Sequence, residues 1–139
     1  MKVVLDTNVV VSGLISPFGN PADILRMVSS GEIQLCFDAR ILMEYKEVLR
    51  RPKFQFEEEK VRSLLDQIER CGQTVAARPL ESPLPDPDDD PFLEVAIAGK
   101  ADCLVTGNIG HFPTNMRQRV RILPPAKFIT FYRKQMKST

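Results

Sequence analysis

The chain begins with an apolar run that stops abruptly at polar side chains. Residues 3–5 are Val-Val-Leu, and residues 6–8 are Asp-Thr-Asn. A short run that is apolar throughout is typical of a parallel strand covered on both faces. In open α/β sheets, ligands bind at the edge formed by the carboxyl ends of the strands. The run therefore predicts a buried strand that presents Asp6 to a crevice.

Strand-like and helix-like segments alternate along the rest of the chain. Further strands are predicted at residues 33–37, 74–77, 102–106 and 120–123, and helices at 20–30, 39–49, 57–70, 88–98 and 126–136. This alternation predicts a three-layer α/β/α sandwich around a mostly parallel sheet of four to five strands. Right-handed crossovers would bring the carboxyl ends of all strands to one edge. Residues 9–15 simply continue the first apolar run.

Several helix ends carry recognisable signals. Asn20 is expected to cap the helix that follows it, with Pro21 in the first helical position, and Gly31 is expected to end that helix. Asp38 is expected to cap the next helix. At least one of the three aspartates at residues 88–90 is expected to cap the helix that begins there.

Length and composition indicate a single soluble domain, residues 1–139. Hydrophobic residues make up 43% of the chain and charged residues 27%, which is ordinary for a globular protein. Four prolines between residues 78 and 88 suit an extended loop inside this domain. No apolar run approaches the length of a membrane span, and the N-terminus lacks the regions of a signal peptide. Three scattered cysteines read as reduced thiols, so we expect a cytoplasmic protein.

Charge is balanced overall but unevenly distributed. The net charge is +1, acids crowd residues 81–94, and no Asp or Glu follows Asp102. The basic C-terminal part could face phosphates, although a solvated helix explains it more simply.

Potential metal ligands converge on the predicted sheet edge. Asp6 ends the first strand, Asn108 follows the strand at 102–106, and residues 88–90 begin a helix. Glu44 lies at the border of an apolar helix face, from which it can reach a crevice. Oxygen ligands of this kind suit Mg²⁺ or Mn²⁺, and a cation is a physical reason to gather carboxylates that otherwise repel one another.

Each of these residues also has an ordinary structural explanation. Asp6 could cap a helix, and Glu44 could be an exposed helix acid. Aspartates at a helix N-terminus are favoured by its dipole without any metal. Asn108 could only shape a turn, and His111, the single histidine, is expected to be a loop or surface residue.

Three motifs together resemble the PIN-domain nucleases, in particular the branch related to VapC-type toxins. They are Val3-Val4-Leu5-Asp6-Thr7-Asn8-Val9, the stretch Asp86-Pro87-Asp88-Asp89-Asp90-Pro91-Phe92-Leu93-Glu94, and Asp102-Cys103-Leu104-Val105-Thr106-Gly107-Asn108. The likeness extends from Met1 to the last predicted helix. It implies a small α/β/α domain with a Mg²⁺ or Mn²⁺ site that hydrolyses RNA.

The resemblance assigns roles by position. Asp6 matches the first acid of the family and Glu44 the second, while the third falls on Asp89 or on Asp90, its close rival. The fourth position, often Asp, is Asn108, which brings an oxygen but no charge and so favours one firmly bound ion over two. Residues expected to support the acids or bound water are Thr7, Asn8, Glu94 and Thr106.

These inferences predict a Mg²⁺- or Mn²⁺-dependent endoribonuclease, the toxin of a toxin–antitoxin pair. Its partners would be RNA, a small antitoxin protein and a second copy of the chain. One alternative is a catalytically weak or inactive module that binds RNA or protein, which Asn108 makes plausible. The other is a phosphatase of the haloacid dehalogenase class, but that chemistry needs a second Asp where this chain has Asn8.

Overall fold

A five-stranded sheet, in which each strand is parallel to its neighbours, forms the centre of the molecule. The structure, a computed structural model, describes residues 1–137. The strands are β1 (Lys2–Leu5), β2 (Gln34–Phe37), β3 (Gln73–Thr74), β4 (Cys103–Val105) and β5 (Ile122–Leu123), arranged in the order β3-β2-β1-β4-β5. The chain builds outward from β1 in one direction through β2 and β3, then returns to build in the other direction through β4 and β5. The strand order therefore reverses between β1 and β4.

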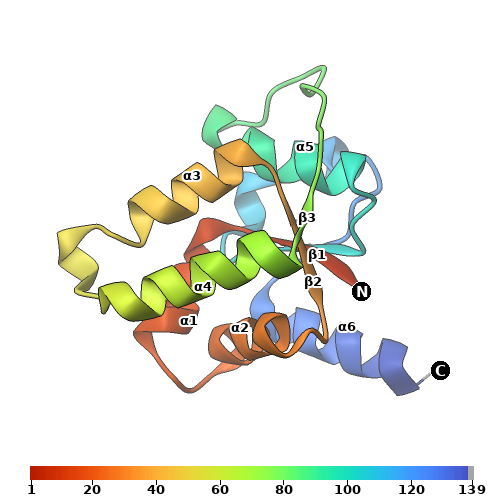
Figure 1. Ribbon diagram of the computed structural model, residues 1–139. Helices are drawn as coiled ribbons and strands as arrows, with labels where there is room; N and C mark the ends of the chain where they lie inside the picture. The colour runs from red at the N-terminus through yellow and green to blue at the C-terminus, as the bar shows by residue number, and fades with distance from the viewer. Residues whose placement is uncertain (138–139) are drawn as a thin grey trace.

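Within residues 1–137, six α-helices surround the sheet and confirm the predicted sandwich. They are α1 (Thr7–Ile15), α2 (Asn20–Ser30), α3 (Ala39–Val48), α4 (Glu58–Cys71), α5 (Asp90–Ala98) and α6 (Pro125–Lys137). In Figure 1, α5 lies on one side of the strands, and α2 and α6 lie together on the other. Short 3₁₀ turns occupy residues 52–54, 87–89, 109–111 and 114–116.

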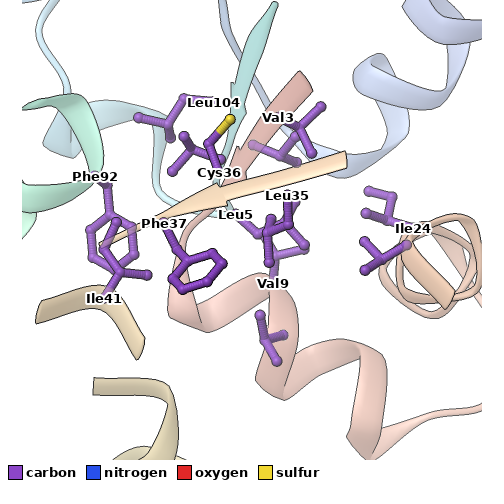
Figure 2. Close-up of a cluster of buried hydrophobic side chains, with 14 of the residues drawn as sticks. Val3, Leu5, Val9, Ile24, Leu35, Cys36, Phe37, Ile41, Phe92 and Leu104 are labelled. Carbon is purple, nitrogen blue, oxygen red and sulfur yellow. The ribbon is translucent and has the colours of Figure 1, made fainter. Parts of the chain in front are cut away.

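The core forms where strand side chains meet helices from both layers. Leu5, Leu35 and Leu104 are at most 1% exposed, and Figure 2 shows them among side chains contributed by several helices. Those helical side chains are Val9 of α1, Ile24 of α2, Ile41 of α3 and Phe92 of α5. Burial of one such side chain stabilises the fold by about 1.5–3 kcal/mol. Because helices cover both faces of the sheet, the apolar strands gain this stabilisation on both sides.

Residues that follow β1 fold into a helix that the sequence pattern did not assign. The helix α1 begins at Thr7, directly after the strand, and it buries Val9 and Val10. At Gly13 it lies so close to α2 that an added Cβ would come within 2.5 Å of Cδ1 of Leu25. Because β1 ends at Leu5 and α1 begins at Thr7, Asp6 lies at the carboxyl end of β1, between the strand and the helix.

Helix ends follow some of the predicted signals and not others. Gly31, with φ of 81°, ends α2 in the left-handed conformation, and the Asp38 side chain caps α3 by accepting a hydrogen bond from the amide of Ile41 at 3.0 Å. Asn20 is the first residue of α2 and not its cap, because Gly19 occupies the cap position. Among the aspartates at residues 88–90, Asp89 occupies the cap position of α5, as predicted for one of them, but its side chain makes no capping hydrogen bond.

Two predicted strands are shorter than expected, with two residues each. The strand predicted at 74–77 is observed at Gln73–Thr74 and so begins one residue earlier; its pairing with β2 ends where the amide of Val75 donates to the carbonyl of Phe37 at 2.9 Å, since β2 ends at Phe37. The strand predicted at 120–123 pairs only at Ile122 and Leu123, beside the short β4.

Two further expectations concern thiols and membranes. Cys36, Cys71 and Cys103 are all unpaired, as their spacing suggested. Within residues 1–137, no helix is long and apolar enough to cross a bilayer.

Candidate active site

The candidate site lies where the strand order reverses, at the carboxyl ends of β1 and β4. The amide of Asp6 donates to the carbonyl of Val105 at 2.9 Å, so the two strands end level with each other. Polar residues follow both strands at this point, Asp6 to Asn8 on one and Thr106 to Asn108 on the other. A reversal of strand order opens a crevice between connections that leave in opposite directions, and it is the usual place for a ligand in such sheets.

Asp6 is held by side chains from both strand ends. Its side chain is nearly buried, with 6% of the residue exposed. Its Oδ2 accepts hydrogen bonds from the hydroxyl of Thr106 at 2.8 Å and from the side-chain amide, Nδ2, of Asn8 at 3.3 Å. The side-chain carbonyl of Asn8 in turn accepts a hydrogen bond from the backbone amide of Gly107 at 3.0 Å. The hydroxyl of Thr106 accepts one from the backbone amide of Asn108, also at 3.0 Å. This network fixes one carboxylate oxygen and ties the two loops together.

Glu44 reaches the same crevice from α3. The hydroxyl of Thr7 donates to Oε2 of Glu44, which joins this acid to the residue next to Asp6. The neighbouring Tyr45 is fully buried, and its hydroxyl donates to the carbonyl of Leu5 at the end of β1. Because α3 is anchored on the strand end in this way, the Glu44 side chain is half-buried at the crevice rather than free on the surface.

Asp89 supplies the third carboxylate and lies in the 3₁₀ turn before α5. It is 9% exposed, and its Oδ2 lies 3.1 Å from Nδ1 of His111. Asp90 has a different environment, because its Oδ1 accepts the amide hydrogen bond of Leu84 at 2.9 Å and braces the proline-rich loop.

Glu94, one turn into α5, is also occupied by structural contacts. One of its oxygens pairs with the Arg40 guanidinium at 2.6 Å, and the other accepts from the amide of Leu80 at 3.0 Å. Arg40 also pairs with Asp38 at 2.7 Å. Glu94 thus links α3, α5 and the loop between β3 and α5.

Burial raises the pKa of all three acids, and the charge of Asp6 adds to the shifts of Glu44 and Asp89. Burial, followed by the nearby charge of Asp6, raises the pKa of Asp89 from 3.8 to about 6, against the opposing effect of His111. Burial also raises the pKa of Asp6, although the Thr106 hydrogen bond opposes this. Burial raises the pKa of Glu44 too, opposed by Thr7 and reinforced by the charges of Asp6 and Asp88. The crevice therefore concentrates negative charge that nearby cationic side chains do not fully offset.

Such a set of donors suits a hard divalent cation. All are oxygen ligands, and a cation would offset the burial of the three charged carboxylates and the repulsion that Asp6 exerts on Glu44 and Asp89. Within residues 1–137, no three Asp, Glu, His or Cys side chains lie close enough together to bind one ion directly. Mg²⁺ keeps several of its water ligands and needs only one or two carboxylates. The arrangement therefore suits Mg²⁺ better than it suits an ion that must be fully surrounded by protein ligands.

His111 is the residue of this site that sequence reasoning missed. It was expected to be an ordinary loop residue, yet its ring contacts Asp89, and its charge when protonated affects Asp6. Its position three residues after Asn108 was the available indication in the sequence. A turn that follows β4 can place a residue at this position beside the carboxyl end of the sheet.

Comparison with known proteins identifies the family and the fold. The model of the PIN domain matches residues 2–110, which contain Asp6, Glu44, Asp89 and Asn108. The chain belongs to the PIN-domain family. This PIN domain matches no curated protein.

A solved structure with the same fold is VapBC2 from Rickettsia felis, determined with a DNA fragment from their promoter. The match has a TM-score of 0.53 and 16% sequence identity, and it covers 89% of this chain and 98% of the other. The identity is low, so the likeness concerns the fold, and it agrees with the α/β/α architecture and parallel sheet.

Proposed function

We propose that this PIN domain is a Mg²⁺- or Mn²⁺-dependent endoribonuclease that acts in the cytoplasm. The observation that carries the proposal is the convergence of Asp6, Glu44 and Asp89, from three separate segments, on the point where the strand order reverses. The family to which the chain belongs consists of nucleases, which supports hydrolysis of a phosphodiester.

Asp6, Glu44 and Asp89 would hold the cation, one or two of them directly and the rest through its water ligands, with Asn108 assisting through its side-chain oxygen. When bound, such an ion activates a water molecule and neutralises charge on the phosphate and on the leaving oxygen. Asp89 is preferred to Asp90 as the third acid, because Asp90 already accepts the Leu84 amide while Asp89 lies within the electrostatic reach of Asp6.

The remaining polar residues would orient the acids. Thr106 and Asn8 hold Oδ2 of Asp6, and Thr7 holds Glu44. Glu94 would act at a distance, by fixing Arg40 and the loop at Leu80. Asn8 bridges Asp6 and Gly107, a role unlike that of the general acid of a haloacid dehalogenase phosphatase, so the structure favours the nuclease over that alternative.

We also propose that the domain acts as the toxin of a toxin–antitoxin pair, with a small antitoxin and a second copy of the chain as partners. The matched fold of VapBC2 supports this assignment. Large apolar side chains exposed at Ile15, Phe18 and Met43, between 61% and 82%, are consistent with a surface that another chain covers. Co-expression with the product of the neighbouring reading frame, followed by measurement of molecular mass in solution, tests both partners.

The catalytic proposal is tested with labelled single-stranded RNA and Mg²⁺ or Mn²⁺. Wild type should cleave the RNA internally, and cleavage should stop when the metal is chelated. Asp6→Asn should lower the rate by about 100-fold or more, since even indirect contacts of a metal ligand are worth 10–100-fold. Asp66→Asn, on the exposed face of α4, is the matched control and should keep full activity.

Three results would contradict the proposal. Full activity of Asp6→Asn would remove that residue from the chemistry. Binding of RNA by wild type without metal-dependent cleavage would favour the non-catalytic alternative. A phosphoryl group trapped on Asp6 would favour the phosphatase.

A further inference from the structure

We propose that His111 is a positioning residue that holds the Asp89 carboxylate toward Asp6 through a hydrogen bond from Nδ1. This inference rests on the proposed function, because it concerns how the third acid is kept in place for a cation. His111 lies one position beyond the residues that the PIN-domain family model matches, which end at residue 110.

The contact itself is specific. Nδ1 of His111 lies 3.1 Å from Oδ2 of Asp89, and 22 residues separate the two in sequence. Within residues 1–137, this is the single hydrogen bond that the Asp89 carboxylate makes. Asp6, in contrast, is held by two side chains. The orientation of Asp89 therefore depends on His111.

Asp89 needs such a partner because the crevice repels it. Burial disfavours the charged form of Asp89, and the nearby charge of Asp6 adds to this cost. Its neighbours hold the backbone of the turn but not the carboxylate, since Asp86 accepts the amide of Asp88 and Asp90 accepts the amide of Leu84. Without His111, rotation of the Asp89 side chain toward solvent would relieve the repulsion.

His111 is itself well placed to act as a fixed donor. Its amide bonds to the carbonyl of Asn108 at 3.0 Å, so the 3₁₀ turn starts directly from the β4 end of the site. The next residue, Phe112, is fully buried and anchors the turn in the core. Arg117 donates to the carbonyl of Phe112 at 2.8 Å and holds the other side of the turn. The ring is half exposed, so its position follows from the backbone and the Asp89 contact rather than from close packing.

The first experiment reads the contact directly and uses no metal. The chain contains one histidine, so a nitrogen-15 spectrum of its ring contains a single imidazole. At about pH 8.5, where imidazoles are neutral, wild type should carry the proton on Nδ1, because the hydrogen bond to the carboxylate selects that tautomer. Asp89→Ala should remove this preference. A wild-type ring protonated on Nε2 would overturn the proposal.

The second experiment measures the consequence for the cation and for turnover. His111→Ala should weaken Mn²⁺ binding, measured by calorimetry, by about 10-fold, in the range found for residues that orient metal ligands. It should lower kcat for RNA by a similar factor and change KM by less than about 2-fold. His111→Asn should restore both quantities to within about 3-fold of wild type, because its side-chain amide can donate from a similar position. Asn115→Ala, an exposed position in the following turn, is the matched control.

The outcomes separate this proposal from the proposed function. If wild type binds Mn²⁺ and cleaves RNA but His111→Ala does both equally well, the positioning role is wrong and the nuclease assignment stands. If both His111 variants lose activity alike, the ring has a task other than orienting Asp89, which also overturns the proposal. If wild type binds Mn²⁺ without cleaving RNA, the nuclease assignment fails, while Mn²⁺ affinity and the ring spectrum still test the positioning role. A wild type that binds no Mn²⁺ overturns both.

Discussion

The hydroxyl of Thr106 donates a 2.8 Å hydrogen bond to Oδ2 of Asp6, across 100 residues of sequence. Thr106 is fully buried, and its oxygen also accepts the amide hydrogen bond of Asn108. One side chain thus links the first acid of the site to the loop that carries Asn108 and leads to His111. The ends of β1 and β4 are therefore joined by the side-chain hydrogen bond between Thr106 and Asp6 as well as by the pairing of the two strands.

Replacement of Thr106 tests this link. Thr106→Val keeps the shape but leaves Oδ2 of Asp6 and the amide of Asn108 each without this partner. We expect the free energy of unfolding to fall by about 1–2 kcal/mol in urea titrations, as for a buried polar group that loses its hydrogen bond. The rate of RNA cleavage should fall by about 10-fold or more. Thr106→Ser, which keeps the hydroxyl, should retain most of both, and equal losses in the two variants would contradict this role.

The two adjacent aspartates should respond differently to substitution. Asp89→Asn should lower RNA cleavage by about 100-fold while the protein stays folded, because the proposed third ligand loses its charge. Asp90→Asn should keep activity within a few-fold, since its amide oxygen can still accept from Leu84. Asp90→Ala should instead cost about 1–2 kcal/mol of stability through loss of that hydrogen bond. Cleavage assays and urea titrations on the three variants distinguish the two positions, and the reverse pattern would assign the role to Asp90.

Close packing between α1 and α2 gives a prediction about stability alone. A Cβ at Gly13 would lie 2.5 Å from Cδ1 of Leu25 and 2.9 Å from the carbonyl oxygen of Pro21. Gly13→Ala should therefore destabilise the protein by about 1–3 kcal/mol, despite the better helix propensity of Ala, because the two helices must move apart. Gly110→Ala, where a Cβ has nothing within 4 Å, is the control and should leave the urea midpoint nearly unchanged. An equal midpoint for both variants would contradict this account of the packing.

The local sequence pattern predicted much of the fold. The apolar run at residues 3–5 and the alternation of strand-like with helix-like segments are compatible with few arrangements of strands and helices. The rule that parallel strands share one edge then brought Asp6 and Asn108 together. The helix at residues 7–15 could not be assigned from periodicity, since apolar residues continue from the strand into the helix without a break. The displaced third strand reflects where β2 ends, which is a property of the partner strand.

Contacts between distant side chains explain what was missed at the site. The place of His111 three residues after Asn108 indicates that it lies near the sheet edge. Its contact with Asp89 could not be predicted, because that contact exists only after two separate turns pack at the same edge. The choice between Asp89 and Asp90 likewise depends on Leu84, whose amide draws Asp90 away. The sequence could indicate which kinds of residue gather at the edge, but their pairing depends on tertiary structure.

The raised pKa values of the acids predict how stability depends on pH. The pKa of Asp89 is about 6 in the folded protein against an ordinary value of 3.8, so the folded state binds more protons between these values than the unfolded state. Its contribution to stability is therefore fully present below about pH 4 and is lost as the pH rises through about 6. Asp6 and Glu44, whose pKa values are also raised, act in the same direction.

Urea titrations without metal should accordingly show stability falling between about pH 4 and pH 7. We expect Asp89 to account for about 1–2 kcal/mol of this fall after allowance for solvent screening at the open crevice. Asp89→Asn should remove that part of the fall and be the more stable protein at pH 7. Because a cation competes with protons for the same oxygens, Mg²⁺ should stabilise wild type more at pH 7 than at pH 5. Stability that rises over this pH range, or stabilisation by Mg²⁺ that is equal at both pH values, would mean that the three acids do not share one electrostatic site.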